Sequence, residues 1–144
     1  MSQPSLRLIS GLPYLKERLA ELYAAGRNGH AEQFAAAFAE NGTMRIVADN
    51  RLVPESGPFQ GRAAIAKGVR NWCGRYEYLD GLVVDVIADF DIAVTRRQLT
   101  LRSIATGSVA DFDVADFVRF QNGQIVELAQ FIDTASLAVL SGRI

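Results

Sequence analysis

Apolar positions in the first half of the chain recur at steps of three and four residues, the spacing of one face of an α-helix. The first stripe consists of four leucines with charged residues between them, Leu12, Leu15, Leu19 and Leu22. A second, shorter stripe pairs Phe34 with Phe38, and we expect Asn41-Gly42 to end that helix. A third stripe is formed by Ile65, Val69, Trp72 and Tyr76. The pattern predicts three helices, with a strand over residues 43–48 before the third.

The second half of the chain is rich in β-forming residues and is divided by short turns. The predicted strands are Leu82–Phe90, Ile92–Ala105, Ser108–Phe120 and Gln124–Ile132. Short turns make consecutive strands antiparallel neighbours. Residues 134–140 are predicted to form a final short helix. Helices followed by an antiparallel meander indicate an α+β fold, with helices packed on one face of the sheet.

The chain has 144 residues, so we expect one domain over residues 1–144. Apolar residues make up 49% and charged residues 22%, an ordinary globular balance. The net charge of −1 gives no basic excess to neutralise phosphates, so nucleic acid is not an expected partner. Residues 1–10 hold no long apolar signal segment, and no apolar run reaches the ~18–20 residues that cross a bilayer. We therefore expect a cytoplasmic protein without a membrane partner.

Cysteine and histidine each occur once, as Cys73 and His30. An internal disulfide and zinc sites built on several such ligands are therefore excluded. The sequence also lacks the glycine-rich signatures of nucleotide sites and the nucleophile elbow of serine hydrolases. We expect neither a metal nor a cofactor. Chemistry by carboxylates, arginine, tyrosine or amides remains, as does binding alone.

Three polar side chains, Asp116, Arg97 and Gln130, interrupt strand faces that are otherwise apolar. Residues two apart on a strand share a face. The apolar companions on these faces include Val114, Val118, Leu99 and Leu128. The three polar residues are therefore expected to lie on the core side of the sheet.

The turns predict how these strands pair. A two-residue turn at Thr106-Gly107 would place Arg97 directly opposite Asp116, an arrangement that favours the ionised carboxylate. A three-residue loop over residues 121–123 would place Gln130 one step diagonal from Asp116. The three side chains would then converge on one patch of the core-facing surface.

Two interpretations of this patch remain open, because buried ionisable groups are costly unless they are paired or functional. In one, a salt bridge between Arg97 and Asp116 braces a solid core. In the other, Asp116, Arg97 and Gln130 are candidate catalytic groups of a pocket between helices and sheet. The walls of that pocket would be Tyr23, Trp72, Tyr76, Leu99, Val114, Val118 and Leu128. Core packing is the alternative role for the aromatic residues.

Three ordered stretches resemble a known superfamily. They are Phe-Ala-Glu-Asn-Gly-Thr at residues 38–43, Gly-Arg-Ala-Ala-Ile at residues 61–65, and the hairpin of residues 116–127. Through them the chain resembles the ketosteroid-isomerase-like, or nuclear-transport-factor-two-like, superfamily, and its SnoaL-like polyketide cyclases in particular. The resemblance implies a curved antiparallel sheet wrapped around three N-terminal helices. This cone-shaped α+β barrel would hold a deep apolar pocket for a small molecule.

The resemblance also implies roles for single positions. Asp116 matches the oxyanion-hole aspartic acid of ketosteroid isomerase, whose carboxyl is protonated. The oxyanion tyrosine of that enzyme falls on Leu22, next to Tyr23. Its general base falls on Ile46, which cannot accept a proton. Isomerisation by that same mechanism is therefore not expected.

A comparison of single positions with limonene epoxide hydrolase leads to a similar expectation. Arg97 matches the arginine of its catalytic triad. The two aspartates of the triad fall on Leu99 and Gln130, so epoxide hydrolysis by that triad is not expected either. A fold does not fix a function, and these departures limit what the resemblance can transfer.

Three functions remain. The first is a cofactor-independent isomerase, cyclase or lyase for a small apolar carbonyl compound, with Asp116 as acid or base and Arg97 or Tyr23 stabilising an enolate-like oxygen. The second is a binding module that keeps the pocket without chemistry. The third is an interaction protein with a filled core.

The composition of the outer sheet face predicts a homodimer, which the resemblance also implies because most relatives dimerise through this face. It mixes apolar with charged positions, and the apolar members are too many for a solvated face. The positions are Val83, Ile87, Ala115, Phe117, Ile125, Ala129 and Phe131, with Arg96, Arg102, Asp111, Arg119 and Glu127.

Overall fold

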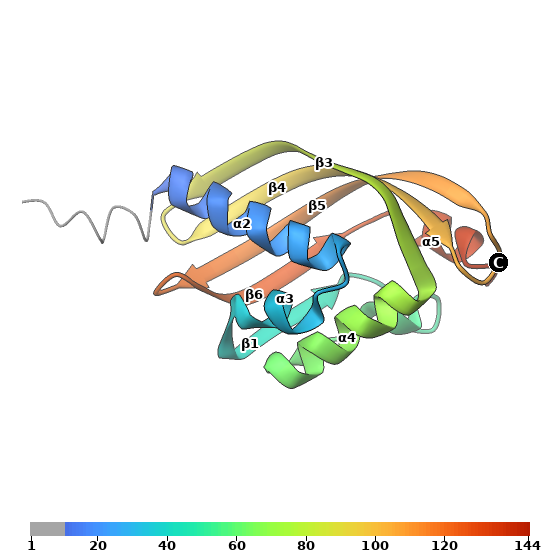
Figure 1. Cartoon of the computed structure of the whole chain (residues 1–144), viewed down its shortest axis with the longest axis horizontal. Helices are drawn as coiled ribbons and strands as arrows, with labels where there is room; N and C mark the ends of the chain where they lie inside the picture. Colours follow the sequence, from blue (N-terminus) through green and yellow to red (C-terminus); the bar gives the residue numbers. More distant parts are fainter. Residues whose placement is uncertain (1–10) are drawn as a thin grey trace, which may run out of the picture.

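The computed structural model describes residues 11–144, in which helices cover one face of a curved β-sheet (Figure 1). The helices are α2 (Leu12–Arg27), α3 (Ala31–Ala36), α4 (Arg62–Arg75), α5 (Thr134–Leu140) and the short 3-10 helix η1 (Pro54–Ser56). The strands are β1 (Phe38–Ile46), β2 (Phe59–Gln60), β3 (Tyr76–Asp89), β4 (Ile92–Ser103), β5 (Val109–Gln121) and β6 (Gln124–Phe131). The predicted α+β fold is confirmed. The N-terminal stretch judged above for a signal segment lies outside the described residues.

The leucine stripe forms α2 as predicted. Leu15, Leu19 and Leu22 are buried, and Pro13 occupies the first turn, where its missing N–H costs no hydrogen bond. In α4 the apolar stripe is buried up to Trp72, while Tyr76 already begins β3. Among the described helices none is both long and apolar enough to cross a membrane.

The predicted end of the second helix is wrong. Helix α3 ends at Ala36 and β1 begins at Phe38, so Asn41-Gly42 lies inside the strand, where its pairing with β6 is irregular. A Cβ atom on Gly42 would lie 2.9 Å from the carbonyl oxygen of Ile125. The glycine therefore marks a close approach of two strands and not a helix end.

The sheet has the strand order β2-β1-β6-β5-β4-β3. Every neighbouring pair is antiparallel except β1 with β6, which is parallel. The first long strand thus lies beside the last one, and the open edges are β2 and β3. This arrangement sets the β4–β5–β6 meander at the centre of the surface that the helices cover.

Strand β3 begins at Tyr76, six residues before the predicted start. Its pairing with β4 is interrupted by two irregularities, between Tyr78 and Asp80 and between Val83 and Asp85. Such bulges bend a strand and increase its twist. The bend of β3 around α2 and α4 is visible in Figure 1.

The register of β4 against β5 is shifted by two residues from the predicted one. Arg97 pairs with Val114, and Asp116 pairs with Thr95. The connection is longer than the predicted two-residue turn, because Ser103 pairs with Ser108 and leaves four residues in the loop. A shift of two keeps each side chain on its predicted face.

The register of β5 against β6 also differs from the prediction. The turn has two residues, Asn122 and Gly123, with φ values of 51° and 77°, as in type I′ hairpins. A bulge at Phe120 restores the face that a two-residue turn would have reversed, so Gln130 pairs directly with Asp116. The same bulge turns Ile125 into the core.

Two positions assigned to the outer face are corrected. Ile125 belongs to the core cluster, and Val83 pairs with the inward-facing Arg97 and lines the cavity. Ala129 keeps its predicted face, where it pairs with Phe117 and is buried by its strand neighbours. Among the remaining apolar members of that face, Ile87 and Phe131 are exposed, and Ala115 and Phe117 are half-buried.

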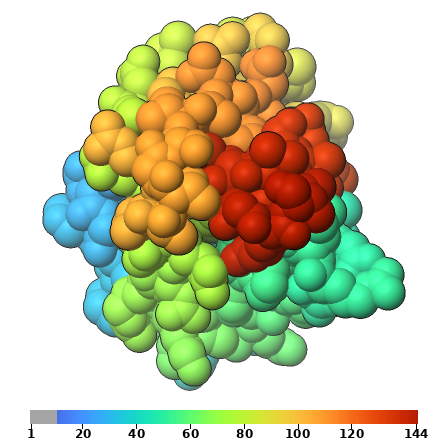
Figure 2. All heavy atoms as spheres, turned by 90° about the vertical axis from the view of Figure 1, so that its right-hand side faces the viewer, coloured from blue at the N-terminus to red at the C-terminus, as the bar shows by residue number. Residues whose placement is uncertain are grey.

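Apolar packing forms two clusters on the helix side of the sheet. One joins α2, α3 and α4 to β5 and β6, and the other joins α4 and the central strands to α5. Figure 2 shows α5 and the C-terminal residues packed beside the β4–β5 turn and the segment that leads into α4. Thr106 anchors this end by donating to the carbonyl oxygen of Leu140 at 2.9 Å.

Candidate functional site

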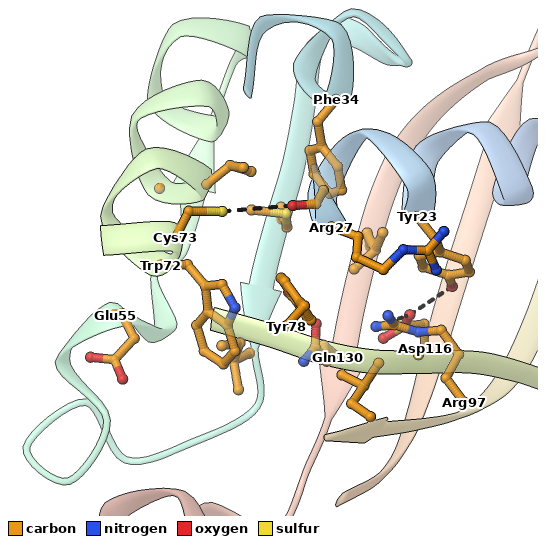
Figure 3. A pocket seen from close by; sticks show the side chains of 18 of the residues that line it. Tyr23, Arg27, Phe34, Glu55, Trp72, Cys73, Tyr78, Arg97, Asp116 and Gln130 are labelled. Atoms are coloured by element: carbon orange, nitrogen blue, oxygen red, sulfur yellow. Dashed lines mark hydrogen bonds and ion pairs between the residues drawn. The ribbon is translucent and has the colours of Figure 1, made fainter. Parts of the chain in front are cut away.

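A cavity of about 90 Å³ lies between the helices and the concave side of the sheet (Figure 3). This volume holds roughly six to nine water molecules, which is room for one small organic ring. Its apolar lining includes Phe34, Met44, Ile46, Phe59, Leu99 and Leu128. The wall is apolar with few polar groups, the usual composition of a small-molecule site.

Asp116 forms the deep polar end of this cavity. It comes from β5, its side chain is 0% exposed, and two donors converge on its Oδ2 atom. The Tyr23 hydroxyl donates at 2.6 Å, and Arg97 Nη2 lies at 2.9 Å. The Thr95 hydroxyl lies 2.7 Å from the Tyr23 oxygen. Helix α2 and strands β4 and β5 thus meet in one hydrogen-bonded cluster.

Arg97 and Tyr23 are also stacked. The guanidinium carbon lies 4.0 Å from the centre of the Tyr23 ring, a cation–π arrangement. Burial, followed by the charge of Asp116, raises the pKa of Tyr23 well above its usual value. Burial lowers the pKa of Arg97, but Asp116 and the two nearby phenols raise it by more, so Arg97 is a permanent cation. Tyr23 is correspondingly a neutral donor.

Asp116 Oδ1 is the unusual atom of this cluster. It is buried, and within residues 11–144 it has no hydrogen-bond partner. Leaving a buried polar atom unpaired costs about 1–3 kcal/mol. One oxygen of Asp116 is therefore doubly bound while the other keeps its full capacity to accept a proton.

A second set of polar groups lines the middle of the cavity. Trp72 Nε1 is buried, and no acceptor within the described residues satisfies it. Tyr78 stands beside it, and burial is the main cause that raises the pKa of Tyr78 to about 12. Figure 3 shows the indole nitrogen turned toward Tyr78 and the amide of Gln130. All three side chains can donate a hydrogen bond.

Glu55 lies at the end of the cavity away from Asp116. Its carboxylate is 2% exposed, accepts a hydrogen bond from Tyr76 at 2.8 Å, and is gripped by both terminal nitrogens of Arg143 at 3.0 and 2.9 Å. Burial alone would raise the pKa of Glu55, but the bonds from Arg143 and Tyr76 hold it below its usual value. This cluster ties the C-terminus to η1. Among the described residues, no group of three or more His, Cys, Asp or Glu side chains is placed to hold a metal ion.

The structure brings Asp116, Arg97 and Gln130 to one cavity. Of the residues predicted as pocket walls, four line it, namely Tyr23, Trp72, Leu99 and Leu128. The other three, Tyr76, Val114 and Val118, are buried in the core and do not line it. Tyr76 does not line the cavity because its hydroxyl donates a hydrogen bond to Glu55 instead.

Sequence reasoning missed several polar members of the site, among them Glu55 in the loop region before α4, Thr95 and Tyr78. Thr95 lies two residues before Arg97 on the same face, so alternation along the strand could have found it. Tyr78 falls in the part of β3 that was not predicted as a strand. Its position depends on the bulge after it, for which the sequence carries no clear signal.

An open curved sheet, helices on its concave face and a mostly apolar cavity with a buried carboxylate at each end define a small α+β pocket protein. A protein-family model described as the SnoaL-like domain matches residues 19–128. The chain therefore belongs to the SnoaL-like domain family. No curated protein matches the sequence.

Solved structures share this fold at low sequence identity. A candidate isomerase from Rhodopseudomonas palustris is 23% identical, with a TM-score of 0.76 over 88% of this chain and 94% of that chain. A protein with a ketosteroid isomerase-like fold from Catenulispora acidiphila, in complex with trimethylamine, is 14% identical, with a TM-score of 0.75 over 88% and 92%. An LEH-like epoxide hydrolase from M. tuberculosis is 16% identical, with a TM-score of 0.68 over 88% of both chains. At these identities the similarity establishes the fold.

Proposed function

We propose that this protein is a cofactor-independent enzyme of the isomerase, cyclase or lyase type, which acts on a small apolar carbonyl compound by proton transfer at Asp116. The observation that carries the proposal is the state of the two carboxylate oxygens. Oδ2 is fixed by Arg97 and Tyr23, while Oδ1 is buried without a partner at the end of an apolar cavity. A general base needs this combination of fixed orientation and a free acceptor.

In the proposed step, Oδ1 takes a proton from the carbon next to the substrate carbonyl. The C–H bond breaks and an O–H bond forms on Asp116. The C–H electron pair becomes a carbon–carbon π bond, and the carbonyl π pair moves onto oxygen to give an enolate. Return of the proton to a different carbon yields an isomer and regenerates the carboxylate.

Arg97 and Tyr23 serve as positioning residues in this scheme. Both donate to Oδ2 and hold the carboxylate in one orientation. The positive charge of Arg97 lies 2.9 Å from Oδ2 and compensates the buried carboxylate, because a buried charge is stable only when it is paired. The mostly apolar lining near Asp116 accounts for the expected apolar substrate, and the other charged side chains of the lining are Arg27, Arg45 and Glu55.

The test uses 3-cyclohexenone, whose conversion to 2-cyclohexenone is followed by ultraviolet absorbance and, in D₂O, by deuterium incorporation. Wild type is expected to accelerate the conversion, and Asp116→Asn to lose at least about 100-fold, the usual contribution of a general base. Asp113→Asn is the matched control, because Asp113 lies on the same strand with its side chain exposed. Equal rates for wild type and Asp116→Asn would overturn the proposal.

The second candidate is a ligand-binding module without catalytic activity. The apolar side chain of Ile46 supports this candidate. Ile46 lines the cavity at the position that matches the general base of ketosteroid isomerase. Binding of the enone without conversion or deuterium exchange would support this candidate against the first.

A further inference from the structure

The polar groups in the middle of the cavity have no function in the proton-transfer scheme above. Trp72 comes from the last turn of α4 and Tyr78 from the start of β3, so both stand on regular elements. The indole is fixed by packing against Tyr76, with ring centroids 4.5 Å apart. Its N–H is buried without an acceptor. Native proteins rarely leave such a donor unpaired, and a site that a ligand completes is one explanation.

The Tyr78 hydroxyl lines the cavity beside the indole of Trp72, where it can donate a hydrogen bond to a ligand. Gln130, whose amide also lines the cavity, pairs directly with Asp116 across β5 and β6. The free donors are therefore next to the carboxylate and not at a distant end of the pocket.

Two donors around Asp116 are already engaged, while Arg97 Nε is buried without a hydrogen-bond partner in the described residues. The Tyr23 proton is given to Oδ2, and Arg97 Nη2 lies on the same oxygen. An enolate oxygen that develops in the cavity needs donors aimed at its own position. Trp72 Nε1 is the buried neutral donor of the cavity that has no partner in the described chain, and the Tyr78 hydroxyl lies beside it.

We propose that Trp72 Nε1 and the Tyr78 hydroxyl together bind the acceptor oxygen of the ligand, the carbonyl that becomes the enolate. This proposal rests on the proposed function and specifies its substrate class. The ligand is a small ring or chain with one carbonyl oxygen at Trp72 and Tyr78 and a carbon acid facing Asp116. A purely hydrocarbon ligand leaves both donors unpaired and is disfavoured.

The chain contains one tryptophan, so the ¹⁵N–¹H spectrum has a single indole signal that belongs to Trp72. Cyclohexanone is the probe, and methylenecyclohexane, which has the same shape but no acceptor oxygen, is the matched control ligand. Titration with cyclohexanone is expected to move the indole proton downfield, as hydrogen bonding does. Methylenecyclohexane is expected to leave it without that downfield shift.

The variants Trp72→Phe and Tyr78→Phe remove one donor each and keep an aromatic ring. Each is expected to weaken cyclohexanone about fivefold to tenfold, the worth of one hydrogen bond, and to leave methylenecyclohexane binding unchanged. Tyr14→Phe is the control, because Tyr14 packs on the core and does not line the cavity. If Trp72→Phe does not fold, the affinity of Tyr78→Phe for cyclohexanone and the indole shift of the wild type test the proposal.

Equal indole shifts with both ligands, or none with cyclohexanone at its solubility limit, would overturn the proposal. The Asp116→Asn variant separates the two proposals. A downfield shift that persists in Asp116→Asn while wild type shows no turnover supports the oxygen site and rejects the enzyme. Turnover that survives both phenylalanine variants unchanged rejects the oxygen site and leaves the role of Asp116 intact.

Discussion

Arg97 reaches Asp116 along a diagonal of the sheet, with Nη2 and Oδ2 2.9 Å apart although the backbone pairs Arg97 with Val114. The diagonal leaves the place directly opposite Asp116 on β4 to Thr95, whose hydroxyl supports Tyr23. A direct pairing would have filled that place with the arginine. The offset thus allows a tyrosine from α2 and an arginine from β4 to hold the same carboxylate oxygen.

The first prediction concerns the ion pair. Arg97→Leu leaves Asp116 buried with Tyr23 as its remaining donor, and we expect a loss of about 3–5 kcal/mol in the free energy of unfolding. Urea unfolding at neutral pH measures the loss.

The control for this substitution is the neighbouring Arg96→Leu. Arg96 is half exposed and pairs with Asp85 on the outer face, so its loss should cost about 1 kcal/mol or less. Equal losses of unfolding free energy in the two variants would show that the buried ion pair stabilises the fold no more than the exposed one.

Much of the site follows from the two-residue alternation along strands. Asp116, Arg97 and Gln130 share the core face because each replaces an apolar residue in an alternating row, and a register shift of two does not change a face. The neighbours within the face were not predictable, because they depend on loop length. A four-residue loop after Ser103 and a bulge at Phe120 moved Arg97 to the diagonal and Gln130 to the direct position.

The fold followed from the order of elements more than from their ends. Helix α5 has its predicted bounds because Asp133 caps it by accepting a bond from the Ser136 N–H. The predicted helix end at Asn41-Gly42 was wrong because this dipeptide occurs both at helix ends and in irregular strands. The parallel β1–β6 pairing brings residues about 85 positions apart together, and no local pattern encodes such a contact.

The second prediction uses the raised pKa of Tyr78, about 12 against a usual 10. Above pH 10 the unfolded chain loses this phenol proton while the folded chain keeps it, so the unfolded state binds fewer protons and stability falls as pH rises. A difference of about two pKa units corresponds to about 3 kcal/mol between pH 10 and 12. Tyr78→Phe should lose correspondingly less stability over that interval, as measured by chemical denaturation at a series of alkaline pH values. Parallel losses in both proteins would show that Tyr78 is not the group responsible.

The third prediction concerns the C-terminal cluster. Arg143→Gln removes two hydrogen bonds from a carboxylate that is 2% exposed, so we expect a loss of about 2–3 kcal/mol at neutral pH. The folded pKa of Glu55 lies below its unfolded value, so this stability is present above the unfolded pKa and is lost as pH falls through the folded pKa. The gap between wild type and variant should therefore close in acid. Arg51→Gln, on an exposed pair with Asp49, is the control and should change stability little at either pH.

The last prediction is that the protein forms a homodimer through the outer face of the sheet. Ile87 is 68% exposed there, with Val94 and Phe131 also exposed on outer positions of β4 and β6. Apolar patches of this kind on a regular sheet face mark association sites. Ile87→Glu adds a charge between Asp85 and Asp89, where no cation of its own strand can neutralise it, and burying that charge in an interface is costly. Sedimentation velocity at micromolar concentration should show a dimer for wild type and a monomer for Ile87→Glu, with unchanged thermal stability of the subunit.

Val139→Glu is the control, because Val139 is 59% exposed on α5, away from the sheet, and should leave the dimer intact. A monomeric wild type, or a dimer lost only in Val139→Glu, would place association elsewhere or rule it out.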